Sequence, residues 1–315
     1  MLIKLQTMKT FQRIIQSIIP VSVILLLTGM NAMSQETIEV KNIKAQMSKG
    51  VQTCYLVEIP QADLKIVQQN WIKKLQSGIK TKVKEVNQEL ILEHIVKNEI
   101  TGDTINIYSL LIDKTDRIVL NVFIQIGDVF FVPKEDKTDL ASDKIDNNII
   151  NYIRSFAVEQ YKLAVTSEFE GEEKVLEGMQ DDLEKLQKES ENLTKDNSSL
   201  ENDIEKTERE IKDIESDIEM KNKDIQSHNT SMLTISSDAD KKLAGEKQKE
   251  LEKEKKQLEK NRSRAKDQVS SYKNNIDKNN NEIKENQKLQ EDKNTEITEQ
   301  TEVVAKVKAK LEGIK

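Results

Sequence analysis

The feature that most constrains this chain of 315 residues is a heptad repeat of apolar residues between Leu176 and Leu311, in a stretch without proline. Apolar side chains recur there at alternating steps of three and four residues. This is the pattern of the a and d positions of a coiled coil, with the heptad written abcdefg. The first half of the repeat keeps one frame: Leu176, Met179, Leu183, Leu186, Leu193, Leu200, Ile204, Ile211, Ile214, Ile218 and Ile225.

A second frame with the same period follows after a break. Its members are Leu251, Leu258, Ala265, Val269, Tyr272, Ile276, Ile283, Ile297, Val304, Val307 and Leu311. The break at 228–238 is poor in helix-forming residues and rich in capping residues. The pattern therefore predicts two long helices folded back on each other as an antiparallel coiled-coil hairpin, with its tip near 229–238. The main alternative is that the same seams join two or three chains in parallel.

Matching polar interruptions in the two frames suggest a register for the hairpin. Pairing Leu193 with Ile276 and Ile211 with Leu258 brings every a position against a d position. It also brings Ser190 against Asn279, and a polar side chain in a seam is tolerated best beside another polar side chain. We therefore predict this register.

Charge favours an intramolecular pair. Residues 167–240 hold 9 basic and 23 acidic residues, whereas residues 241–315 hold 20 basic and 15 acidic residues. An acidic helix is attracted to a basic one and repelled by its own copy. The remaining residues, 1–166, are close to neutral and show no basic face that could follow phosphates, so we expect no nucleic-acid partner.

The N-terminus has the pattern of a secretory signal peptide. Basic residues at Lys4, Lys9 and Arg13 precede an uncharged run, 14–35, whose centre is apolar, and small residues surround Ser34. We expect 1–34 to be a signal peptide cleaved near Ser34/Gln35, so that the protein is exported to a periplasmic or extracellular location without a membrane span. An uncleaved anchor helix is the alternative reading.

Residues 35–166 contain most of the aromatic residues and are expected to form an α+β globular domain with a small antiparallel sheet and packed helices. The elements follow a β-α-β-β-β-β-α order. We predict strands at 51–59, 82–97 (one or two), 104–112, 117–126 and 129–132, a helix opened by Pro60, and a second helix capped by Thr138 or Asp139. Gly171 and Gly178 then suggest a break before the arm, 167–315, although one continuous helix explains the sequence nearly as well.

The sequence offers little for catalysis. Cys54 and His94 could form a thiol–imidazole pair if neighbouring strands brought them together, but a buried cysteine and a surface histidine explain the same residues. We predict no enzyme activity, no catalytic residues, no cofactor and no metal site. The single cysteine also excludes an intrachain disulfide.

The tip is the remaining candidate site. Met232, Leu233 and Ile235 are expected to reach solvent, where they could dock a protein partner or instead close the end of the coil. The sequence thus predicts a non-enzymatic exported structural or interaction protein whose coiled-coil arm acts as a spacer or protein-docking rod, with oligomers through the coiled coil as a further option.

A signal peptide followed by a long helical hairpin resembles the periplasmic Skp-type (OmpH-type) chaperones. That resemblance covers the arm and implies a holdase-type chaperone as an alternative function. Those chaperones tend to be basic and have a small trimerisation core, whereas this chain is acidic and has a separate N-terminal domain. A second alternative is a small-ligand-binding α+β domain carried on a stalk.

Overall fold

The computed structural model describes residues 37–133 and 140–315. It divides into two compact units, the described residues up to Glu172 together with Val303–Lys315, and Glu173–Glu302. The predicted signal peptide and the predicted caps Thr138 and Asp139 lie outside the described residues. Within the described ranges, no helix is both long and apolar enough to cross a bilayer.

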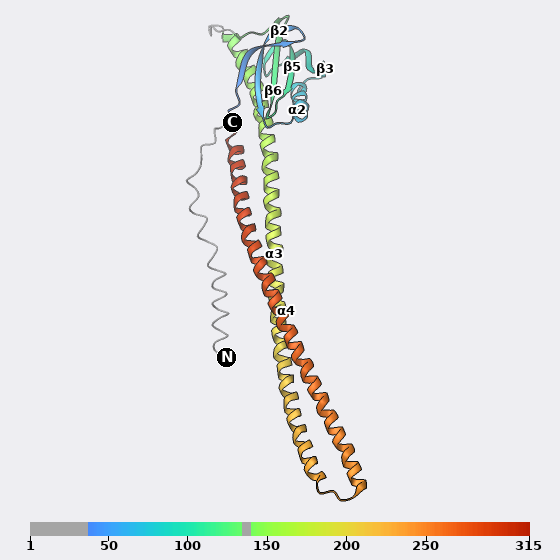
Figure 1. Ribbon diagram of the computed structural model, residues 1–315. Coiled ribbons are helices and arrows are strands. Elements are labelled where there is room, and N and C mark those ends of the chain that lie inside the picture. The colour runs from blue at the N-terminus through green and yellow to red at the C-terminus, as the bar shows by residue number, and fades with distance from the viewer. Residues whose placement is uncertain (1–36, 134–139) are drawn as a thin grey trace, which may run out of the picture. The chain divides into compact units, whose positions relative to one another are not determined.

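The first unit contains an antiparallel sheet and one short helix, and the α+β class predicted from the sequence is confirmed (Figure 1). The strands lie in the order β1-β2-β6-β5-β4-β3, and β7 pairs with the remaining length of β6. The elements are β1 (Val40–Met47), β2 (Gly50–Pro60), α2 (Leu64–Gln76), β3 (Lys84–Val86), β4 (Glu89–Lys97), β5 (Thr101–Asp113), β6 (Arg117–Ile126) and β7 (Val129–Phe130).

One strand, β1, is absent from the predicted order. Most of its side chains are exposed, because it forms an edge of the sheet and pairs with β2 alone. Its sequence therefore carries lysine, asparagine and glutamine instead of the apolar alternation that marks a half-buried strand.

The core lies between one face of the sheet and two helices. Alternate residues of β6 from Ile118 to Ile124 are buried on this face. Trp71 of α2 is fully buried, and its ring lies 4.7 Å from that of Phe156 in the long helix α3 (Leu140–Met232). The inner face of this helix is buried at Ile149, Ile153, Phe156 and Tyr161.

The outer half of the β1–β2 hairpin covers part of the opposite face. The pairing of β2 with β6 covers only Tyr55–Pro60, so the hairpin is free to bend beyond that point. Its Met47 and Cys54 pack against Tyr108 and Phe123 in a second, smaller cluster. The Ser48 hydroxyl also donates to the Glu89 carboxylate, across the sheet.

Helix α2 has a polar cap at each end. The Asp63 Oδ1 atom accepts from the Ile66 amide at 2.9 Å, so the helix begins at Leu64. The prediction that Pro60 opens this helix is wrong, because Pro60 ends β2 and Asp63 provides the cap. At the C-terminus, the buried Lys97 ammonium donates to the carbonyl oxygens of Lys74 (3.2 Å), Leu75 (3.4 Å) and Ser77 (2.6 Å), in the region where a helix runs out of amide donors for its own carbonyl groups.

Helix α3 is continuous over 93 residues. Gly171 and Gly178 lie inside it, so the predicted break is wrong and the continuous alternative is correct. A glycine in a helix costs only about 1 kcal/mol relative to alanine, and the packed stripes on both sides of these positions outweigh that cost. Open space around both glycines also shows that no close approach of another chain segment requires them.

The second long helix, α4 (Asp238–Gly313), ends in the core of the first unit. Val307 and Ile314 are 7% and 5% exposed, and Leu311 packs beside them. The Lys310 ammonium contacts the Glu168 carboxylate of α3 at 2.9 Å. The last turns of α4 therefore belong to the hydrophobic core of the α+β unit.

Replacing Val307 and Ile314 together by serine should lower the free energy of unfolding of the first unit by about 2–5 kcal/mol, because each change removes buried apolar volume and leaves a hydroxyl in its place. Trp71 is the only tryptophan of the chain and lies in this unit, so urea titrations followed by its fluorescence report on it directly. Val303→Ser, at a 37% exposed position of the same segment, is the matched control and should have little effect. Equal stability of the double variant and the control would contradict the conclusion that the end of α4 belongs to the hydrophobic core of the first unit.

The second unit is the predicted antiparallel helical hairpin, formed by α3 and α4 (Figure 1). Its seam is buried at Ile211, Ile218, Leu251 and Val269, a degree of burial that a lone helix cannot give to its own side chains. The coiled-coil frame read from the sequence therefore describes the packed face of both helices.

The predicted register of the hairpin is wrong by one heptad. The Asn279 Nδ2 atom donates to Asn197 Oδ1 at 2.9 Å, and Gln290 Nε2 donates to the Leu186 carbonyl at 3.4 Å. Asn279 was expected opposite Ser190, seven residues away. In the observed register Ile211 shares a layer with Ala265, and Ile218 with Leu258. A shift of seven residues keeps every a–d pairing, so the apolar pattern alone could not distinguish the two registers.

Charged pairs on one flank fix the observed register. Lys266 reaches Glu215 at 3.1 Å and Lys273 reaches Glu208 at 3.6 Å, all four at e positions. Each such exposed pair contributes only about 0.2–1 kcal/mol. Together with the paired asparagines, they favour this alignment over its neighbours one heptad away.

Candidate functional site

The tip of the hairpin is a short turn between Met232 and Asp238. Amide groups of the turn donate back to the end of α3, from Leu233 to the Thr230 carbonyl at 3.3 Å and from Ile235 to the Met232 carbonyl at 3.4 Å. Leu233 is 87% exposed, whereas Met232 and Ile235 are half-buried. The turn thus presents one apolar side chain to solvent and holds two others partly against the hairpin.

Next to the tip, a polar side chain of α3 contacts the backbone of α4. The His228 Nε2 atom lies 2.9 Å from the Ala244 carbonyl, and Ala244 is buried. Because α4 has only just begun at this point, this contact connects the last turns of α3 with the first turns of α4. It also sets the level at which the two helices face each other near the tip.

Two further exposed apolar residues lie close to the tip, Met220 of α3 (55% exposed) and Leu243 of α4 (67% exposed). Neither was identified from the sequence, because both fall outside the a and d positions. The signal was nevertheless present, since both occupy the c position of their heptads, where a coiled coil normally carries polar residues.

One flank of the hairpin is acidic along its length. Seven successive g positions of α3 in the second unit carry a carboxylate: Asp182, Glu189, Asp196, Asp203, Glu210, Asp217 and Asp224. In an antiparallel pair the g positions of both helices lie on the same flank. Between Asp240 and Glu296, α4 supplies one basic residue at its own g positions, Lys247. Most of these carboxylates therefore face solvent without a basic residue opposite them.

An open cavity of about 480 Å³ lies on this flank, below the tip. Its apolar lining is Met220 and Leu258, and its charged lining is Asp217, Lys221, Lys223 and Asp224. The Lys221 ammonium binds Glu254 of α4 at 2.9 Å and Asp224 at 3.6 Å. The cavity thus combines an exposed apolar floor with a rim of both acidic and basic side chains.

The structure does not bring Cys54 and His94 together. Cys54 of β2 is buried in the cluster with Met47, Tyr108 and Phe123, whereas His94 is exposed on β4 and is not part of that cluster. Cys54 is fully buried, and burial raises the pKa of its thiol to about 11. At neutral pH the thiol is therefore protonated, a poor state for a nucleophile.

A polar cluster crosses the second face of the sheet. The Lys49 ammonium contacts the Tyr108 hydroxyl, which also lies 3.3 Å from Gln125 Oε1 and 3.4 Å from Glu93 Oε1. Tyr108 is 1% exposed, so these contacts serve mainly to satisfy a buried hydroxyl and to hold the β1–β2 turn against the sheet.

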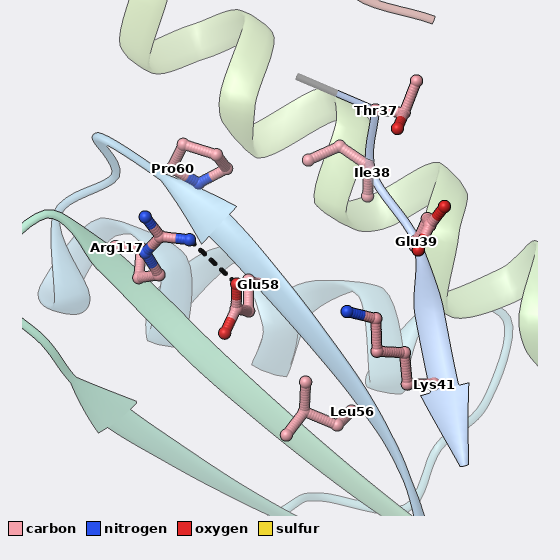
Figure 2. Close-up of a pocket in the computed structure, with 8 residues that line it drawn as sticks. All are labelled: Thr37, Ile38, Glu39, Lys41, Leu56, Glu58, Pro60 and Arg117. Carbon is pink, nitrogen blue, oxygen red and sulfur yellow. Dashed lines mark hydrogen bonds and ion pairs between the residues drawn. The ribbon is translucent and has the colours of Figure 1, made fainter.

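A shallow groove runs along the β1–β2 edge of the same face (Figure 2). It encloses about 70 Å³, small beside the roughly 300–1,000 Å³ of typical ligand sites. Arg117 lies at one end and binds Glu58 at 2.9 Å and Asp116 at 2.6 Å. The side chains that line the groove are Thr37, Ile38, Glu39, Lys41, Leu56, Glu58, Pro60 and Arg117.

Comparisons with protein-family models, with curated proteins and with solved structures find no match to this chain. Within 37–133 and 140–315, no group of three or more His, Cys, Asp and Glu side chains is arranged to hold a metal ion. The hairpin near its tip, with its exposed apolar residues and acidic flank, is therefore the surface on which a functional proposal can be built.

Proposed function

We propose that this protein is a non-enzymatic exported structural or interaction protein, in which the coiled-coil arm serves as a spacer that displays a docking tip. The observation that carries the proposal is the anchoring of both helices in one core. Tyr161 of α3 and Val307 of α4 belong to the same hydrophobic cluster of the α+β unit. Because the base of each helix is held in this core, the two helices cannot separate from the base of the hairpin. A spacer needs this stability.

The length of uninterrupted helix also supports a spacer. Residues 173–232 of α3 alone correspond to about 90 Å of helix at 1.5 Å per residue. A buried seam accompanies this length, and a packed pair of helices resists bending better than a single helix of the same length. Export rests on the signal-peptide pattern at 1–34.

The docking role of the tip is tested by replacing Met232, Leu233 and Ile235 together by serine. A partner identified by crosslinking the native protein in its own cells should be lost from the variant, because the apolar contact that binds it has been removed. Far-UV circular dichroism should be unchanged, since the three residues lie at the end of the hairpin and not in its seam.

Leu289→Ser is the matched control for this experiment. Leu289 is 54% exposed on α4 at a distance from the tip, so its replacement should leave the partner bound. Retention of the partner by the triple variant would show that the tip is not the docking site.

A further inference from the structure

The outer half of the β1–β2 hairpin, residues 43–54, covers part of the sheet face opposite the helices, and we call it the strap. One side of β6 is paired with β5 along its whole length, so β2 and β7 share the other side. There β2 pairs through Tyr55–Pro60, whereas β7 pairs with Gln125 and Ile126. Because β7 occupies the end of this edge, the strap cannot continue the sheet and folds over its face.

The strap covers a small apolar cluster that is separate from the main core. Met47 and Cys54 of the strap pack against Tyr108 and Phe123 of the sheet, and each of these residues is at most 5% exposed. The main core lies on the other face of the sheet, against α2 and α3, and is made of different residues. Lifting the strap would therefore expose the small cluster and leave the main core packed.

Polar contacts of the turn hold the far end of the strap. Ser48 donates to the two carboxylate oxygens of Glu89, through its amide at 3.4 Å and through its hydroxyl. The Lys49 ammonium contacts the Tyr108 hydroxyl and lies 4.5 Å from the centre of the Tyr108 ring. Glu89 is only 3% exposed, and a carboxylate that leaves water loses hydration that such contacts must offset. Opening would restore that hydration, so the net contribution of these contacts to closure is modest.

We propose that the strap is a lid, which opens while the rest of the α+β unit stays folded and uncovers an apolar surface at Tyr108 and Phe123. Proteins open locally in cooperative units, at a lower free energy than global unfolding requires. The strap has the construction of such a unit, because its own ladder, from the Ile43–Cys54 pair to the Met47–Gly50 pair, can stay intact as it moves. The proposal concerns the α+β unit alone and does not rest on the docking role of the tip.

The chain carries a natural reporter for each part of the unit. Cys54, the only cysteine, is fully buried on the inner side of the strap, where burial raises the pKa of its thiol to about 11. In the closed state the thiol is both shielded and protonated, so a water-soluble disulfide reagent reacts with the open state alone. Trp71, the only tryptophan, lies in the main core, and its fluorescence reports on that core separately.

Labelling of Cys54 with dithionitrobenzoate in the purified full-length chain tests the proposal. Under native conditions we expect the labelling rate to correspond to an open fraction at least about 100-fold larger than the unfolded fraction obtained from urea titration of Trp71 fluorescence. The rate should rise little at low urea concentrations, because opening exposes far less surface than unfolding does. A labelling rate that follows global unfolding, with the same dependence on urea, would overturn the proposal.

Weakening the far end of the strap should speed the labelling of Cys54. Ser48→Ala removes the hydroxyl that donates to Glu89, and we expect about tenfold faster labelling or more, because a hydrogen bond to a charged group is lost. Lys44→Ala, at an exposed position of the strap, is the matched control and should leave the rate unchanged. An unchanged rate in Ser48→Ala would contradict a lid that is held closed at this turn.

A variant of the main core separates opening of the lid from unfolding of the unit. Ile153 is fully buried on α3, and Ile153→Val removes one methylene group there, a change small enough to keep the unit folded. It should lower the urea midpoint seen by Trp71 and leave the labelling rate of Cys54 unchanged, because the main core stays packed when the lid opens. Labelling that becomes faster in proportion to the loss of global stability would show that Cys54 reacts only through unfolding, and the lid would be ruled out.

Discussion

Replacing Phe156 by alanine is expected to lower the free energy of unfolding of the α+β unit by about 3–5 kcal/mol. Phe156 is 2% exposed and its ring lies 4.7 Å from that of Trp71. The substitution removes most of a large side chain from the junction of α2, α3 and the sheet. It leaves a cavity that rigid helices on one side and a sheet on the other cannot close.

Fluorescence of Trp71 during urea unfolding measures this effect in the unit where the change is made. Leu163→Ala, on the same helix at a 48% exposed position, is the matched control and should shift the midpoint little. Comparable losses of stability in the two variants would show that α3 does not pack on the core through the face assigned here.

A cysteine pair at Ile211 and Ala265 is expected to bridge within one chain, whereas a pair at Ile204 and Ala265 is not. In the observed register Ile211 and Ala265 share a layer, and Ile204 lies one heptad, about 10 Å, away from that layer. A disulfide requires the two backbones to be close, and a displacement of this size prevents it. The native Cys54 is fully buried, so it should not compete.

Oxidation of dilute protein, followed by non-reducing electrophoresis, separates bridged monomers from linked dimers. Internal bridging of the 211/265 pair alone would establish both the intramolecular hairpin and its register. Faster bridging of the 204/265 pair would instead support the register predicted from the sequence, and linked dimers from both pairs would support a parallel assembly of chains.

Local patterns in the sequence were sufficient to predict most of the fold. The run from Arg117 to Ile126 has one wholly apolar face and one mixed face, and its strand was predicted with the bounds it has in the structure. The edge strand β1 could not be predicted in this way, since a strand with one neighbour and mostly exposed side chains has no apolar alternation. The continuity of α3 through Gly171 could not be predicted either, because it depends on how residues before and after the glycine pack against parts of the chain that are distant in sequence.

The register of the hairpin shows where periodicity stops being informative. A repeat of seven residues looks the same after every shift of seven, so Leu193 can meet Ile276 or Ile283 with equal apolar burial. What decides between them is the pairing of Asn197 with Asn279 and of Glu215 with Lys266. These contacts are individually weak, and the sequence alone does not rank one set of them above another.

For the candidate site, the sequence pointed to the turn but not to the surface beside it. Met232, Leu233 and Ile235 stand out in the sequence because they interrupt a polar stretch. Met220 and Leu243 do not stand out in the same way, because each is a single apolar residue at a c position. Their common flank depends on the antiparallel packing, so only the structure could bring them together.

The participation of Val307 and Ile314 in the core has a consequence for how the protein is made. A ribosome produces the strands of the sheet first, but their hydrophobic face stays incompletely covered until synthesis has passed Ile314. The nascent chain must therefore complete the hairpin before its earliest segment can reach full stability. During that interval the exposed sheet is vulnerable to aggregation, and closure over so long a span of sequence should make final folding slow.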